Sequence, residues 1–219
     1  MKIVNPQNCV FFFDFDNTIA TCDVFDNMLP RFSQDDLWKN LEKDWRKGKI
    51  GSHACLAGQI KGMSITKQAL DKYLQGIKID PYFKKIVHAL DKKNIRTFVL
   101  SDNFDYILNR IMDFHAIRKF RLFSNKLHIN GNKLTPYFPF RSRNCQICAH
   151  CKTKNLLANV GKDSIIVYIG DGRSDICPSQ YADMVFAKDE LLGYFRAKKM
   201  TCFSYRNLKD VYDYFKRSF

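Results

Sequence analysis

Two aspartates, separated by one phenylalanine, follow the most apolar stretch of the sequence. The stretch is CVFFF at residues 9–13, and the aspartates are Asp14 and Asp16. An apolar run of this kind belongs in a protein core, whereas ionised carboxylates are costly to bury unless a partner compensates their charge. We therefore expect a buried strand that holds both carboxylates together at one reactive place.

Two more apolar runs end in polar and reactive residues. RTFVL at 96–100 leads into the polar segment 101–103, and SIIVYIG at 164–170 leads into the acidic segment 171–175. In open α/β sheets, ligands bind at the carboxyl ends of the strands, so these segments should meet at one edge. The side chains expected there are Asp14, Asp16, Ser101, Asp102, Asn103, Asp171 and Asp175.

This set of side chains predicts phosphoryl chemistry. Crowded carboxylates repel each other unless a cation lies among them, and oxygen ligands without nearby histidines favour Mg²⁺. One carboxylate can then attack phosphorus and form a phospho-aspartate, while a second, two residues away, protonates the leaving alcohol and later deprotonates water. Ser101 would bind a phosphoryl oxygen, and a lysine would balance the charge of the transferred group. The residues thus predict Mg²⁺-dependent hydrolysis of a small phosphomonoester.

The elements that position these residues follow an alternating pattern. Buried strands are predicted at 9–13, 96–100, 164–170 and 184–187, with helices beginning near Pro81, Phe104 and Lys152 between them. Asp80 is a suitable cap for the helix that starts at Pro81. Strands that alternate with helices predict a Rossmann-like α/β fold, in which three layers place helices on both faces of a parallel sheet.

Residues 20–79 interrupt this pattern. They contain helical patterns punctuated by glycines and no convincing strand, so we expect a small helical cap inserted directly after the first strand. The predicted domains are therefore a core of residues 1–19 and 80–219 and a cap of residues 20–79. Residues 121–138 contain two β-like runs around Asn130-Gly131, which indicates a hairpin.

The composition favours a folded, basic protein. The chain has 219 residues, 46% hydrophobic, and a net charge of +14 from 36 Lys+Arg against 22 Asp+Glu. The basic residues are spread along the chain, so we interpret them as a solvated surface that attracts phosphate-bearing partners and not as a nucleic-acid-binding face. No secretory leader and no apolar window of ~18 residues is evident, which predicts a cytoplasmic protein with reduced thiols and no membrane partner.

Three of the eight cysteines form a closely spaced group. Cys145, Cys148 and Cys151, with His150 among them, could hold a tetrahedral Zn²⁺ ion. Adjacent His150 and Cys151 would not easily reach the same metal, and no second CxxC pair follows. We therefore favour packed or free thiols over a zinc site.

Four motifs in this sequence resemble those of the haloacid dehalogenase superfamily of phosphatases. They are DFDNT at 14–18, Ser101 after TFVL, Lys152 at the start of a helix, and GDGRSD at 170–175. The resemblance covers nearly the whole chain. It implies that Asp14 is the nucleophile and Asp16 the acid/base, with Ser101 and Lys152 completing the catalytic set.

The resemblance also implies a metal site and a set of substrate-binding candidates. The Mg²⁺ ligands would be Asp14, the Asp16 carbonyl and Asp171, with Asp175 supporting them. Thr18 would shape the turn after the nucleophile. Thr18 and Asn103 are also expected to bind the substrate.

A helical cap directly after the first motif resembles the phosphoserine-phosphatase-like branch. Within it, RSRNCQICAHCKTKNLL and YIGDGRSDICP look most like phosphoethanolamine/phosphocholine phosphatases and methionine-salvage phosphatases. The first likeness makes Asp102 a candidate for selecting the substrate. Asp23, nine positions after Asp14, matches by spacing an acidic residue that faces the substrate ammonium, although Asp26 fits the same role. These carboxylates predict an amine-bearing or polyhydroxyl leaving group.

Three alternatives stay open at this level. The protein would be a phosphotransferase, a methionine-salvage phosphatase acting on 2-hydroxy-3-keto-5-methylthiopentenyl-1-phosphate, or a basic, zinc-containing nucleic-acid-binding protein on a retained fold. The sequence leaves the choice between a monomer and a homodimer undecided.

Overall fold

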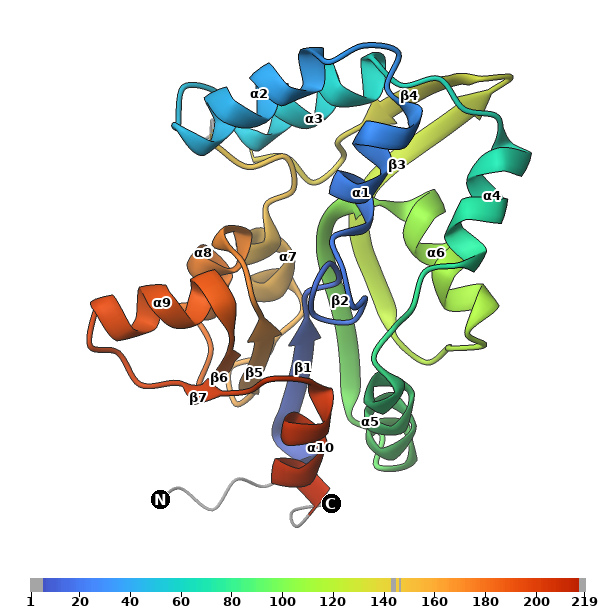
Figure 1. Cartoon of the computed structure of the whole chain (residues 1–219). Coiled ribbons are helices and arrows are strands. Elements are labelled where there is room, and N and C mark those ends of the chain that lie inside the picture. The colour runs from blue at the N-terminus through green and yellow to red at the C-terminus, as the bar shows by residue number, and fades with distance from the viewer. Residues whose placement is uncertain (1–5, 143–144, 146, 217–219) are drawn as a thin grey trace.

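A seven-stranded sheet forms the centre of the molecule (Figure 1). The computed structural model describes residues 6–142, 145 and 147–216. The strand order is β4-β3-β2-β1-β5-β6-β7. The strands are β1 (Cys9–Phe13), β2 (Arg96–Phe104), β3 (Arg121–Asn130), β4 (Lys133–Tyr137), β5 (Ile165–Gly170), β6 (Met184–Ala187) and β7 (Phe203–Ser204).

The predicted α/β class is confirmed, with one antiparallel addition at the edge. β1 lies between β2 and β5 and is parallel to both. β4 pairs antiparallel with β3, so the hairpin predicted around Asn130-Gly131 is present, and Gly131 has the positive φ of 60° that such a turn favours. Because β1, β2 and β5 run in one direction, their carboxyl ends lie at the same edge of the sheet.

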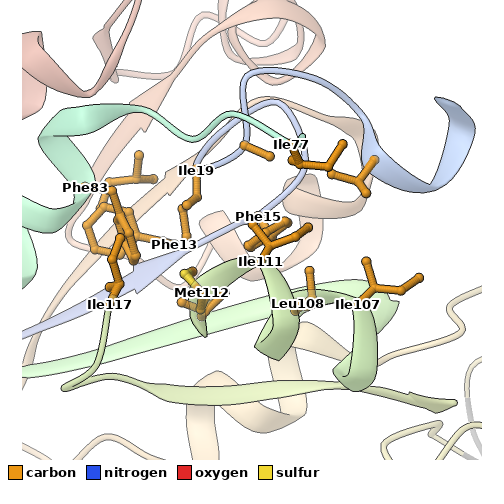
Figure 2. Close-up of a cluster of buried hydrophobic side chains, with 14 of the residues drawn as sticks. Phe13, Phe15, Ile19, Ile77, Phe83, Ile107, Leu108, Ile111, Met112 and Ile117 are labelled. Carbon is orange, nitrogen blue, oxygen red and sulfur yellow. The ribbon is translucent and has the colours of Figure 1, made fainter. Parts of the chain in front are cut away.

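Alternating side chains of β1 explain why this strand is the most apolar segment of the chain. Phe11 and Phe13 pack on one face, against helices α5 (Pro81–Lys92), α6 (Asp105–Phe114) and α10 (Leu208–Lys216). Val10 and Phe12 pack on the other, next to Leu156 of α7 (Lys152–Ala158). Burying a side chain of this size contributes about 1.5–3 kcal/mol, so β1 is held firmly on both sides. Figure 2 shows part of the hydrophobic cluster that contains Phe13.

Two short helices complete the second face. They are α8 (Ile176–Ser179) and α9 (Asp189–Ala197). Leu191 and Phe195 of α9 pack on Val185 and Ala187 of β6. None of the helices in the described part of the chain has the length and apolar content that crossing a bilayer requires.

Four helices are inserted between β1 and α5, above the carboxyl edge of the sheet in Figure 1. They are α1 (Val24–Phe32), α2 (Leu37–Arg46), α3 (Ser52–Lys61) and α4 (Lys67–Gln75). The two ends of the insertion meet in an antiparallel bridge between Ala20 and Ile79. In α4, Asp71 accepts hydrogen bonds from Tyr106 and Arg110 of α6, which fixes that end of the insertion to α6.

Candidate active site

Three predicted catalytic residues and one predicted metal ligand come together at the carboxyl edge of the sheet. Asp14 follows β1, Ser101 lies within β2, Asp171 follows β5, and Lys152 is the first residue of α7. All four are buried, with exposed fractions between 1% and 7%. Their convergence gives a fixed cluster of charges on rigid elements, whereas the role of each residue stays a prediction.

Lys152 is the centre of this cluster. Its Nζ atom lies 2.5 Å from Asp14 Oδ1, 2.8 Å from Asp175 Oδ1 and 2.9 Å from Ser174 Oγ. Burial favours the neutral amine, but the charges of Asp14 and Asp175 outweigh it and raise the pKa of Lys152 well above its ordinary value. The lysine therefore keeps its proton and supplies a positive charge beside Asp14.

Three carboxylates beside this lysine are grouped as metal ligands are. Oxygen atoms of Asp14, Asp171 and Asp175 all lie within 4.8 Å of one another. Burial and the charges of neighbouring carboxylates raise the pKa of Asp14 well above its usual range and that of Asp171 to about 6. This repulsion is what a bound cation would relieve, and a hard oxygen set without histidine fits Mg²⁺.

Asp175 is held by more donors than its neighbours. One oxygen accepts from Lys152 and from Tyr168 Oη at 2.7 Å, and the other accepts the backbone N–H groups of Asp171 and Gly172 at 3.1 Å. Both oxygens of Asp175 thus accept hydrogen bonds within the protein, and this carboxylate holds the backbone of Asp171 in place. A Cβ atom at Gly170 would lie 2.5 Å from Asp175 Oδ2, so a glycine is needed there.

Asp16 is oriented differently from Asp14. It accepts hydrogen bonds from the backbone N–H of Val24 at 2.9 Å and from Asn103 Nδ2 at 3.1 and 3.2 Å. Burial and the nearby charge of Asp23 raise its pKa well above the usual range. A carboxyl group whose pKa is raised in this way is suited to general acid catalysis. Asn103 therefore orients Asp16.

A pocket of about 520 Å³ opens beside these residues. It lies between the edge of the sheet and helices α1 to α3, and Asp23, Asp26 and Asp102 line it. Asp23 also caps α1 by accepting the backbone N–H of Asp26 at 2.8 Å. Thr18 is not among the lining residues: it is buried and donates to Asp171 Oδ1 at 3.0 Å. Thr18 therefore contacts the predicted metal ligand Asp171 and does not line the pocket, where a substrate-binding residue was expected.

Asp102 has an incomplete set of partners. Its Oδ1 atom is buried without a hydrogen-bond partner in the part of the chain that the structure describes. Burial raises the pKa of Asp102 to about 6, although the nearby backbone N–H of His150 and the charge of Lys152 favour the carboxylate. An unpaired buried acceptor in a pocket is suited to receive a donor from a ligand.

Several residues around the site carry no sequence motif and were not predicted. Glu42 and Trp45 of α2 line the pocket, but nothing in a solvated helical pattern distinguishes them. His150 is 1% exposed, its Nδ1 lies 2.8 Å from the Ser101 carbonyl, and Asn155 Nδ2 lies 2.6 Å from its Nε2. Burial lowers the pKa of His150 to about 4, so the neutral ring links the end of β2 to α7.

The cysteine group does not form a metal centre in the described residues. The aspartate trio is the one group there whose ligand atoms have metal spacing, and none of the eight cysteines, all at described positions, is part of a disulfide. Partial burial opposes ionisation of the Cys145 thiol, but the backbone N–H groups of Cys148 and Ile147 favour the thiolate and lower the pKa of Cys145. Burial raises the pKa of the Cys177 thiol, and the nearby charges of Cys145 and Cys151 raise it further.

The family model and the similar curated proteins described below are phosphatases, as the motifs predict. The family model described as Putative Phosphatase matches residues 9–202. The chain is 26% identical over 184 residues to the "Bifunctional enzyme MtnB/MtnX" of Bacillus licheniformis, which covers 82% of the chain but 42% of that enzyme. It is also 26% identical over 218 residues to the "2-hydroxy-3-keto-5-methylthiopentenyl-1-phosphate phosphatase" of Geobacillus thermodenitrificans, covering 96% of the chain and 97% of the relative.

Among solved structures, the fold is similar to that of a phospho-aspartyl intermediate analogue of phosphoserine phosphatase. The TM-score is 0.70 at 20% sequence identity, and the match covers 94% of this chain and 97% of the other. At this identity the likeness concerns the fold.

Proposed function

The chain belongs to the Putative Phosphatase family and is a phosphoric monoester hydrolase of the haloacid dehalogenase superfamily, and from this premise we propose a Mg²⁺-dependent mechanism through a phospho-aspartate. The observation that carries the proposal is the contact of Asp14 with protonated Lys152, beside Asp171 and at the pocket that Asp16 also lines. The phosphoserine phosphatase of similar fold was solved as a phospho-aspartyl analogue, which supports the same intermediate here.

The proposed reaction has two steps. An oxygen of Asp14 attacks phosphorus, the ester P–O bond breaks, and Asp16 gives its proton to the leaving alcohol oxygen. Asp16 then takes a proton from water, whose oxygen attacks the phosphorus of the aspartyl phosphate and releases inorganic phosphate and Asp14. Ser101 binds a phosphoryl oxygen and Lys152 offsets the negative charge in both steps.

Asp14 and Asp171 would hold the Mg²⁺ ion, together with the Asp16 carbonyl that the family resemblance implies. When bound, the ion would neutralise charge on the carboxylates and on the phosphoryl oxygens. Asp175 and Thr18 would keep Asp171 in place.

Removal of divalent cations should abolish phosphate release. With EDTA in excess, we expect a loss of at least about 100-fold, because Asp14 and Asp171 would repel each other and a substrate phosphate. Added Mg²⁺ should restore the rate, and Ca²⁺ serves as a control because it prefers longer bonds and more ligands. Full activity in EDTA, with metal-free protein verified by elemental analysis, would exclude the metal from the mechanism.

The pocket favours a leaving group with positive charge or many hydroxyls. Nine of the described side chains that line it are carboxylates, against two arginines, although the whole chain has a net charge of +14. Burial, with the charges of Asp23 and Glu42, raises the pKa of Asp26 to about 7. An ammonium group among these carboxylates, next to Trp45, would relieve their repulsion. We propose that residues 20–79 act as a cap whose carboxylates select such a substrate.

Asp102→Ala and the isosteric Asp102→Asn should change the ranking of substrates. We expect kcat/KM to fall about 10- to 100-fold for phosphoethanolamine and phosphocholine, because a hydrogen bond or ion pair with a charged group is lost. Glycerol phosphate should change little. A panel of these esters, phosphoserine and sugar phosphates measures the effect, with the exposed Asp163→Asn as matched control. An unchanged ranking in both Asp102 variants would refute selection by Asp102.

A second candidate function comes from the curated relatives. Several are named as 2-hydroxy-3-keto-5-methylthiopentenyl-1-phosphate phosphatases, and Phe25 and Leu56 give part of the pocket wall the apolar character that a methylthio group fits. That substrate carries no cation, so Asp102→Asn should leave its turnover intact. Direct assay of this intermediate beside the amine-bearing esters separates the two functions. For the phosphotransferase and nucleic-acid-binding alternatives, the described residues provide no specific support.

A further inference from the structure

A tyrosine beyond the family match reaches the site from the carboxyl-terminal part of the chain. The match ends at residue 202, and Tyr205 follows β7 in the segment that leads to α10 (Figure 1). Its backbone N–H donates to the Ala187 carbonyl at 3.2 Å, and the residue is 4% exposed. This segment thus crosses from the edge of the sheet toward β5 and β1.

The hydroxyl group of Tyr205 has two neighbours. Tyr205 Oη lies 3.2 Å from the Gly170 carbonyl oxygen and 3.3 Å from Thr18 Oγ1. Thr18 has one hydroxyl proton and donates it to Asp171 Oδ1 at 3.0 Å. Tyr205 must therefore be the donor toward Thr18, and its proton is shared between Thr18 and Gly170.

These contacts act on Asp171 from two directions. Gly170 is the residue before Asp171, so the bond to its carbonyl fixes the backbone that presents the carboxylate. The chain of hydrogen bonds from Tyr205 through Thr18 fixes the carboxylate itself, and each bond in such a chain polarises the next. The aromatic ring alone would fill space but would supply neither contact.

We infer that Tyr205 is a positioning residue for Asp171, through Thr18, and that it sets the affinity of the site for a divalent cation. The inference rests on the proposed metal-dependent function. Groups that orient a metal ligand typically change metal affinity by about 10- to 100-fold when they are lost. Tyr205 contacts neither the predicted metal ligands nor the pocket directly, so its effect should be on metal affinity and much less on kcat at saturating metal.

Tyr205→Phe tests this inference because it removes one oxygen atom and keeps the ring. With Mn²⁺ as the probe, titration followed by electron paramagnetic resonance of the free ion should show a dissociation constant about tenfold higher than in the unaltered chain. Thr18→Val should give a similar increase, the double variant little more, and Thr18→Ser affinity close to the original. Tyr212→Phe, on α10, is the matched control.

The outcomes separate this inference from the proposed function. If the unaltered chain binds no Mn²⁺, the metal-dependent function fails, and the inference fails with it. If that chain binds Mn²⁺ and Tyr205→Phe binds it equally well, the inference alone is overturned. A loss of kcat at saturating Mn²⁺ with unchanged affinity would also overturn it, since that pattern indicates a role other than positioning a metal ligand.

Discussion

Asp14→Asn should lose roughly 10⁴-fold or more of the phosphatase rate, as enzymes do when their nucleophile is removed. Asparagine has nearly the shape of aspartate but does not form an acyl phosphate. Its side-chain oxygen can still accept a hydrogen bond from Lys152, which contacts Asp14 in the structure. Because burial already opposes the charge of Asp14, replacing it with a neutral amide should leave the protein folded.

Two measurements check this prediction. Release of inorganic phosphate gives the rate, and mass spectrometry of quenched reactions reveals the phosphoryl group on the unaltered chain and its absence in Asp14→Asn. Circular dichroism controls for folding, and the exposed Asp163→Asn controls for the loss of one negative charge. A folded Asp14→Asn variant that still turns over at a rate near that of the unaltered chain would exclude Asp14 as the nucleophile.

Lys152→Met should lower both activity and stability. The rate should fall about 10³-fold, because no fixed positive charge would remain beside the transferred group. Lys152 is paired with Asp14 and Asp175, and side chains of the three are at most 9% exposed. Removing one partner of a buried ion pair costs about 3–5 kcal/mol in the free energy of unfolding, since the remaining charges are uncompensated.

The loss of stability should depend on pH in a defined direction. Without the lysine, the pKa of Asp14 would be raised further in the folded protein, so the folded state would bind more protons than the unfolded state above the unfolded pKa. Stability of Lys152→Met should therefore recover as the pH falls from 7 toward 5. Urea unfolding at several pH values measures this, with the exposed neighbour Lys154→Met as control. Equal losses in the two variants would contradict the assigned role of Lys152.

Local patterns were sufficient to predict the strands that place Asp14 and Asp171 at one edge of the sheet. The runs 9–13 and 164–170 correspond to β1 and β5, and each ends where carboxylates begin. A fully apolar segment bounded by polar residues has few alternatives to a buried strand, so the position of Asp14 and Asp171 followed from it. β2 was predicted too short: it continues through the polar residues to Phe104, with an irregular register after Leu100.

Residues that depend on tertiary contacts were not predictable in this way. Tyr168 lies in the apolar run of β5, where its hydroxyl contact with Asp175 has no local signal. Glu42 and Trp45 reach the pocket because of how α2 is placed above the sheet, which helical periodicity does not specify. β7 and α10 were not predicted either. β7 pairs with β6 through two residues of each strand, which is too short for a recognisable sequence pattern.

Gly170 illustrates how a neighbour can dictate the identity of a residue. Its own backbone would tolerate a side chain, but a methyl group there would collide with the carboxylate of Asp175. Gly170→Ala is therefore not a conservative change: it would push Asp175 away from both Lys152 and the loop after β5. The Asp175 carboxylate fills the space beside the end of this strand and so limits which residues can stand at position 170. A substitution there that adds no charge and removes no catalytic group would still disable the enzyme.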